Sequence, residues 1–161
     1  MTVVTVLGGG QLGRMLGLAG IPLGIGFRFL DPSPDATARA VGDLVVGGLD
    51  DVAAAAKAAD GADVITYEWE GVPAETAVAL AADAPVRPSA RALEVSQDRL
   101  VEKTMFQGLG IATAPFTAVG ARAELDDAIA RLGLPAVLKT RRGGYDGKGQ
   151  AVVRDVRKLA S

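Results

Sequence analysis

Short runs of β-branched residues alternate with longer segments rich in alanine and leucine over the first half of the chain. This alternation is typical of βαβ units, in which helices connect parallel strands. Hydrophobic residues make up 49% of the chain but aromatic residues only 4%, which favours an aliphatic interior and so a parallel α/β sheet. The pattern predicts strands at 2–7, 25–30, 43–46 and 63–67 and helices at 11–19, 50–60 and 74–82.

The composition changes at residues 84–99, APVRPSARALEVSQDR, where two prolines and a run of polar residues predict a domain boundary. We expect a first domain over residues 1–90 and a second over residues 91–161. The second is predicted to contain a helix at 98–107, a strand at 116–119, a helix with Leu125, Ile129 and Leu132 on one face, and strands at 136–140 and 150–154.

The composition also excludes several kinds of site. The 161 residues include no cysteine and no histidine, so disulfides, thiolate metal sites and a histidine base are excluded. A metal would need oxygen ligands, which favours magnesium carried on phosphates. A net charge of -2 gives no global basic field, so nucleic acid is not an expected partner.

No membrane association is predicted either. Residues 15–27 carry one charge-free stretch, but it is shorter than the roughly 18 apolar residues that a bilayer requires and glycine and proline interrupt it. The segment VVTVLGGG near the amino terminus lacks the pattern of a secretory signal, and the cytoplasm is the expected compartment.

The segment LGGGQLGRM follows the first predicted strand and opens the first predicted helix. Gly8, Gly10 and Gly13 fit the GxGxxG spacing, whose backbone amides and helix dipole can hold a phosphate. Asp31 closes the second strand, where a dinucleotide-binding fold places its ribose-binding acid. Two interpretations remain open here: a nicotinamide-dependent oxidoreductase, or a tight turn that only lets the helix pack on the sheet.

Two acidic residues follow the fourth predicted strand, in TYEWEGVP. Ligands of open α/β sheets bind at the carboxyl ends of the strands, so Glu68 and Glu70 are expected to face the same crevice as the glycine loop. The alternative is that both are solvated loop acids. Trp69 between them is predicted to lie in the core.

The segment RRGGYDGKGQ, residues 141–150, combines four glycines with three cations directly after an apolar run. Glycine brings backbone amides close to a ligand, and lysine and arginine supply charge for phosphate. This composition indicates a loop that covers an anion. A hairpin with solvated charges is the other interpretation.

In this order, the segments GGGQLGRM, YEWEGVP, SQDRLVEK and LKTRRGGYDGKGQ resemble one family, the 5-(carboxyamino)imidazole ribonucleotide synthetases of the ATP-grasp superfamily. The resemblance extends from Met1 to Arg154. It differs in that Trp69 and Gly71 stand where Phe and Asn are usual, and that chains of the family continue well beyond Ser161. It implies a Rossmann-like pre-ATP-grasp domain with a parallel sheet, followed by the first, small subdomain of an incomplete ATP-grasp fold.

The resemblance implies a ligase of purine biosynthesis that carboxylates the amine of 5-aminoimidazole ribonucleotide, with ATP and bicarbonate as the other substrates and carboxyphosphate as the intermediate. A homodimer is a possible assembly. It further implies Mg²⁺ ligands outside this chain, so that the isolated 161 residues are expected to be inactive. An ATP-grasp ligase with another acceptor stays open beside the oxidoreductase.

The resemblance also assigns residues to roles. Tyr145, Asp146 and Lys148 would be catalytic, with Asp146 orienting the attacking amine. By similarity to the related formate-dependent glycinamide ribonucleotide transformylase, Gln11, Leu12 and Glu70 would contact the acceptor. Arg141 and Arg142 are left between phosphate binding and a solvated rim, and Glu102 and Lys103 are expected to be exposed helix residues. Contacts to ATP would come from Arg99, Lys139, Gly144, Tyr145, Asp146, Gly147, Lys148, Gly149 and Gln150.

Overall fold

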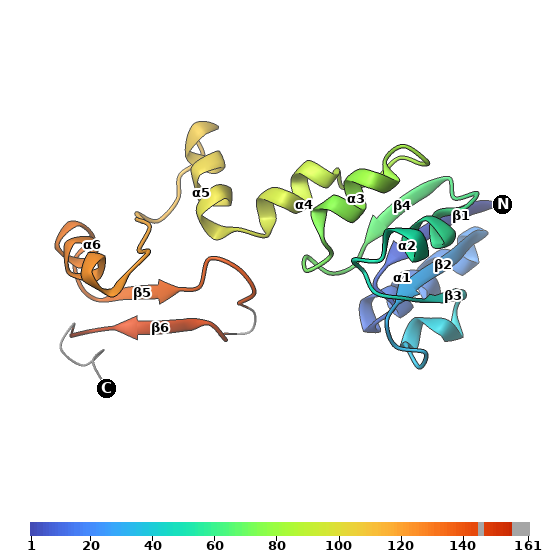
Figure 1. Ribbon diagram of the computed structural model, residues 1–161, viewed down its shortest axis with the longest axis horizontal. Helices are drawn as coiled ribbons and strands as arrows, with labels where there is room; N and C mark the ends of the chain where they lie inside the picture. The colour runs from blue at the N-terminus through green and yellow to red at the C-terminus, as the bar shows by residue number, and fades with distance from the viewer. Residues whose placement is uncertain (145–146, 156–161) are drawn as a thin grey trace. The chain divides into compact units, whose positions relative to one another are not determined.

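The computed structural model describes residues 1–144 and 147–155. The chain divides into two compact units, Met1–Glu94 and Val95–Ser161, which are described separately (Figure 1). Among the described residues, no helix is both long and apolar enough to span a bilayer.

The first unit is built on a parallel sheet of four strands in the order β3-β2-β1-β4. In register, Leu7 pairs with Leu30 and with Tyr67, so β1, β2 and β4 end level with one another at one edge of the sheet. The predicted α/β class and the four predicted strands are confirmed. The strands are β1 (Thr2–Leu7), β2 (Ile25–Asp31), β3 (Asp43–Val46) and β4 (Val64–Tyr67).

The predicted helices of this unit are confirmed as well, and short 3-10 turns accompany them. The sequence pattern missed a helix of about two turns at residues 90–96, which crosses the boundary between the two units, because the preceding prolines and its polar residues suggested a linker. The elements are α1 (Gln11–Gly20), η1 (Ile21–Leu23), η2 (Thr37–Ala40), α2 (Val52–Ala59), α3 (Ala74–Leu80) and α4 (Ala90–Ser96).

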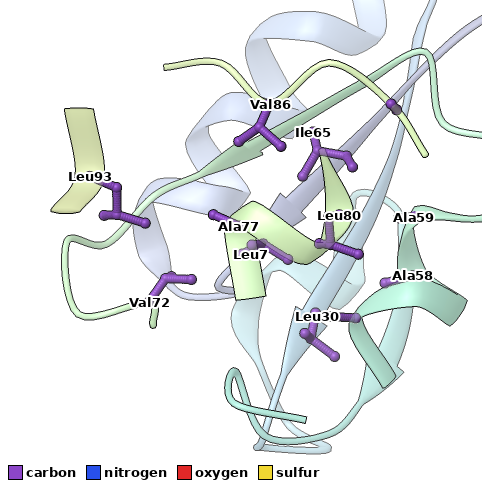
Figure 2. Packing of buried hydrophobic residues seen from close by; sticks show 12 residues of the cluster. Leu7, Leu30, Ala58, Ala59, Ile65, Val72, Ala77, Leu80, Val86 and Leu93 are labelled. Carbon is purple, nitrogen blue, oxygen red and sulfur yellow. The ribbon is translucent and has the colours of Figure 1, made fainter. Parts of the chain in front are cut away.

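The core of the first unit lies on both faces of the sheet. On one face, Leu7, Leu30 and Ile65 pack with alanines of α2 and with Ala77 and Leu80 of α3 (Figure 2). Because neighbouring strand residues point to opposite faces, the residues before Leu7 and Leu30 build a smaller cluster on the other face. That cluster contains Val6, Phe29 and Ala38.

A row of glycines along α1 faces the sheet. Gly13, Gly17 and Gly20 are buried in this helix. A Cβ atom on Gly17 would stand 2.4 Å from Val41 Cγ2, and one on Gly20 would stand 2.5 Å from the ring of Phe27. The last glycine of the GxGxxG pattern therefore belongs to a packing surface.

The second unit contains α5 (Arg99–Gly108), η3 (Arg122–Glu124), α6 (Leu125–Leu132) and the strands β5 (Ala136–Lys139) and β6 (Gln150–Val153). The two strands form an antiparallel hairpin in which Lys139 pairs with Gln150. Val137, Leu138 and Val152 in this hairpin stay exposed. Two strands alone seldom supply a stable core, so this unit has little buried apolar surface.

The predicted strand at 116–119 is wrong, because residues 111–120 form neither helix nor strand. Their β-branched and aromatic residues favour extended backbone, but no neighbouring strand pairs with them in the described part of the chain. Instead, Lys103 of α5 lies with its ammonium 5.2 Å from the centre of the Phe116 ring. Glu102 and Lys103 are helix residues as expected, but the expectation that they are exposed is wrong, since both are half-buried.

Candidate functional site

The loop between β1 and α1 requires glycine at its first position. Gly8 has a φ of +106°, a conformation that L side chains rarely adopt. Its backbone N–H donates to the Leu30 carbonyl oxygen over 2.9 Å, which fixes the loop to the end of β2. A Cβ atom here would also stand 2.7 Å from Glu68 Cγ and Oε1. Conformation and close approach thus both select glycine.

Two carboxylates accept hydrogen bonds from the amides of this loop. Gly9 N donates to Asp31 Oδ2 over 2.8 Å, and Gly10 N donates to Glu68 Oε1 over 3.3 Å. A dinucleotide-binding loop offers its amides to the pyrophosphate. A phosphate placed here would instead meet two negative charges. The geometry therefore disfavours the oxidoreductase interpretation, and Asp31 binds the protein backbone at the position where that interpretation required a ribose.

Glu68 faces the glycine loop, as expected from its place at the end of β4. Gln11 and Leu12, at the start of α1, are exposed near the same edge of the sheet, and Glu70 is also exposed. Glu68 is bound to the loop. The acceptor-site candidates whose side chains reach solvent at this edge are therefore Glu70, Gln11 and Leu12.

The prediction that Trp69 lies in the core is wrong. Its side chain is 56% exposed, and its ring lies over Gly71, where a Cβ atom would stand 2.4 Å from Trp69 Cζ2. β4 ends at Tyr67, so the alternation that would have turned residue 69 inward no longer applies. Tyr67, at the end of the strand, has a pKa raised by burial.

In the second unit, the glycine-rich segment forms a closed hairpin loop between β5 and β6. Thr140 N donates to the Gly149 carbonyl oxygen over 2.8 Å at the base of the loop. A Cβ atom on Gly149 would stand 2.6 Å from Thr140 Oγ1, and one on Gly144 would stand 2.9 Å from the Lys148 carbonyl oxygen. Gly143, Gly147 and Gly149 all have φ between +69° and +79°. The glycines let the loop fold back on itself.

Two of the predicted ATP-binding residues lie against this loop. The Arg99 guanidinium donates to the Gly144 carbonyl oxygen over 2.6 Å, and Arg99 N donates to the Arg141 carbonyl oxygen over 3.0 Å. Lys139 is exposed at the end of β5, and no ion pair of its ammonium is found in the described residues. Lys148 is exposed in the loop itself.

Tyr145 and Asp146, predicted to be catalytic, lie outside the described residues. Within residues 1–144 and 147–155, no group of three or more Asp, Glu, His or Cys could hold a metal ion.

Asp98 is a residue that the sequence did not single out. Arg141 donates to both of its oxygens, Nη2 to Oδ2 over 2.7 Å and Nε to Oδ1 over 3.2 Å. Arg142 Nε donates to Oδ2 over 3.4 Å. Oδ1 also accepts from the backbone of Leu100 and Val101, so the same carboxylate caps α5.

The charges around Asp98 explain its acidity. The pKa of Asp98 is lowered to about 2, mainly by the hydrogen bond from Arg141. Burial opposes this shift, and the backbone hydrogen bonds from Leu100 and Val101 and the charge of Arg141 add to it. Both arginines that were assigned to phosphate or to a solvated rim therefore bind an internal acid. The available sequence signal was an aspartate at the cap position directly before a helix.

Comparisons with known proteins identify the family of the chain. Residues 1–97 match the model of the ribonucleotide synthetase preATP-grasp domain, and residues 104–161 match that of the ATP-grasp domain. The chain is 52% identical over 151 residues to N5-carboxyaminoimidazole ribonucleotide synthase of Pseudomonas aeruginosa, covering 94% of this chain and 42% of that protein. The chain thus spans less than half the length of this curated relative.

Solved structures show the same relationship. The N5-carboxyaminoimidazole ribonucleotide synthetase of Thermus thermophilus superposes with a TM-score of 0.88 at 54% identity, covering 96% of this chain and 41% of that one. The synthase of Aspergillus clavatus, solved with ADP and 5-aminoimidazole ribonucleotide, superposes with a TM-score of 0.87 at 28% identity, covering 98% of this chain and 42% of that one.

Proposed function

Because the chain belongs to the ribonucleotide synthetase preATP-grasp family and continues into an ATP-grasp domain, we propose that it provides part of the ATP and acceptor sites of a carbon–nitrogen ligase. The reaction is the ATP-dependent carboxylation of 5-aminoimidazole ribonucleotide by bicarbonate. The observation that supports the proposal is the set of hydrogen bonds at the base of the glycine-rich segment, where Arg99 binds Gly144 and Arg141 and Thr140 binds Gly149, next to Lys139.

In this proposal a bicarbonate oxygen attacks the γ-phosphorus of ATP, so that ADP leaves and carboxyphosphate forms. The amine of the acceptor then attacks the carboxyl carbon, the C–O bond to phosphate breaks, and the nitrogen loses a proton. Phosphoryl transfer depends mainly on positioning and on neutralising charge. Lys139, Lys148 and the loop amides supply both without a side-chain nucleophile, which suits a chain that has no histidine and no cysteine.

The two glycine loops take different ligands in this proposal. The amides of the first loop are bound by carboxylates, and Gln11, Leu12 and Glu70 would contact the acceptor. The second would offer cations and amides to the triphosphate. Tyr145, Asp146 and Lys148 would be the catalytic residues, with Asp146 orienting the amine.

Magnesium would neutralise the charge of the ATP phosphates, and such an ion normally takes one or two protein carboxylates. Within the described residues, no group of three or more Asp, Glu, His or Cys could hold a metal ion. As the resemblance implies, we propose that the ligands of Mg²⁺ lie outside this chain.

Nucleotide profiling tests the proposal. In the longer enzyme that contains this chain, ATP with magnesium should raise the melting temperature and NADH should not, because a ligand stabilises the state that binds it. A shift with NADH alone would favour the oxidoreductase. Bicarbonate-dependent ADP formation that requires another amine in place of 5-aminoimidazole ribonucleotide would favour a ligase with a different acceptor.

A further inference from the structure

Asp98 connects two segments of the second unit that are more than 40 residues apart in sequence. Its carboxylate caps the first turn of α5 (Arg99–Gly108) and accepts from Arg141 and Arg142 at the start of the hairpin loop. The neighbouring Arg99 adds two further hydrogen bonds to the same loop, through its backbone and its guanidinium.

The Asp98 carboxylate is buried, whereas the two arginines that it binds are largely exposed. The side chain of Asp98 is only 5% exposed, whereas those of Arg141 and Arg142 are 58% and 66% exposed. A buried carboxylate is costly without partners, and here both its oxygens are bound by cations or backbone amides. The two guanidiniums are held from the protein side, so their heads are not free to reorient around a bound phosphate.

We propose that Asp98 is a positioning residue for the nucleotide: by binding Arg141 and Arg142, its carboxylate holds the start of the glycine-rich segment, residues 141–144, where it presents backbone amides and the adjoining Lys139 to the triphosphate. This inference rests on the proposed function for the identity of the ligand. It assigns the two arginines to loop tethering in place of direct phosphate binding.

The variant Asp98→Asn isolates the charge of this anchor. Asparagine caps a helix about as well as aspartate, so α5 keeps its cap. The charge-assisted bonds to Arg141 and Arg142 are lost. The matched control is Asp35→Asn, which neutralises the exposed partner of Arg39 in the first unit, an ion pair of 2.8 Å with an 87% exposed carboxylate.

The first measurement needs no nucleotide. Trypsin cleaves after arginine and lysine, so limited proteolysis of the longer enzyme, read by mass spectrometry, reports the opening of the loop at residues 141 and 142. Asp98→Asn should speed these cleavages about tenfold, the equilibrium effect of losing one hydrogen bond to a charged group. Asp35→Asn should leave them unchanged. Equal cleavage rates in wild type and Asp98→Asn would overturn the proposal.

The second measurement is the steady-state dependence on ATP. Asp98→Asn should raise the KM for ATP about tenfold by the same equilibrium effect while kcat changes less, because a positioning residue makes no contact with the reacting atoms. In the double variant with Arg141→Met the two losses should not add, since both remove one interaction. Faster cleavage with an unchanged KM, or additive losses, would show that the anchor does not position the nucleotide.

Two safeguards keep these outcomes separate. If Asp98→Asn does not fold, the same two measurements are made on Arg141→Met alone. This variant removes the other partner of the ion pair, and because Arg141 is exposed the substitution should not prevent folding. Should the wild-type enzyme show no ATP dependence, the proposed function fails, while the cleavage rates still decide whether Asp98 holds the loop.

Discussion

At the scale of single residues, Asp98 makes the stability of the second unit depend on pH. Its pKa is about 2 in the folded protein and about 3.9 in an unfolded chain. A carboxyl whose folded pKa is depressed stabilises the fold above its unfolded pKa, and this contribution is lost as the pH falls through the folded pKa. The relevant window therefore runs from about pH 4 down to about pH 2.

We expect Asp98→Asn to be less stable than wild type at neutral pH by an amount that stays constant down to about pH 4 and then shrinks toward pH 2. Urea unfolding followed by circular dichroism across this range measures the difference. The other carboxyl groups are common to both proteins and cancel. A difference that does not change with pH would mean that the anchor does not act through charge.

Lys139 gives the second prediction at this scale. In the longer enzyme, Lys139→Ala should lower kcat/KM for ATP by about 2 to 4 kcal/mol of transition-state stabilisation, the effect of removing one preorganised charge contact. The control is Lys57→Ala, on the exposed face of α2, which should leave kcat/KM for ATP unchanged. Unchanged kinetics of Lys139→Ala would remove this residue from the nucleotide site.

At the scale of elements, the caps of α2 and α5 follow one rule. Asp51 accepts from Ala53 N and Ala54 N over 3.0 Å each, just as Asp98 accepts from Leu100 N and Val101 N. The difference lies in their surroundings, because Asp51 is exposed and Asp98 is buried against two arginines. Asp51 therefore only caps its helix, whereas Asp98 caps its helix and also binds the arginines of the hairpin loop.

Asp51→Ala should lower the free energy of unfolding of the first unit by about 0.5 to 2 kcal/mol, since it leaves two amides of α2 without a partner. Asp51→Asn should be nearly neutral, because the amide oxygen can accept the same bonds. Chemical denaturation of the three proteins measures the effect. If Asp51→Asn lowered the free energy of unfolding as much as Asp51→Ala, the charge of Asp51 and not its cap hydrogen bonds would be the stabilising factor.

At the scale of the whole molecule, the two units differ in how much core they hold. The first unit buries aliphatic residues on both faces of a four-stranded sheet. The second has a two-stranded sheet whose Val137, Leu138 and Val152 are exposed. The chain also spans only 42% of a curated relative.

A polypeptide of these 161 residues is therefore expected to fold in its first unit without turning over ATP. The described residues contain no acidic cluster for magnesium, and magnesium on ATP normally needs one or two protein carboxylates. A steady-state assay with ATP, magnesium, bicarbonate and 5-aminoimidazole ribonucleotide, run beside the longer enzyme, measures this. Comparable turnover by the two would show that the metal ligands lie within this chain.

The sequence alone determined the first unit almost completely. Its strands are short apolar runs, β-branched in β1, β3 and β4 and phenylalanine-containing in β2, and its main helices are alanine- or leucine-rich. Local periodicity was therefore enough for the sheet, for α1 to α3 and for the glycine loop at its edge. The hairpin of the second unit was equally local, because a glycine-rich turn joins its two strands. Lys139 and Arg99 could be assigned only through the resemblance, and their roles stay predictions.

The tertiary structure decided what depends on partners distant in sequence. Residues 116–119 have strand propensity but no neighbouring strand in the described residues, and Trp69 is apolar but follows the end of its strand. The amides of Gly9 and Gly10 are taken by acids 22 and 58 residues away. Asp98 meets Arg141 across 43 residues. Periodicity and propensity describe a residue and its near neighbours, whereas hydrogen bonds and ion pairs form only where the folded chain brings distant groups within about 3 Å.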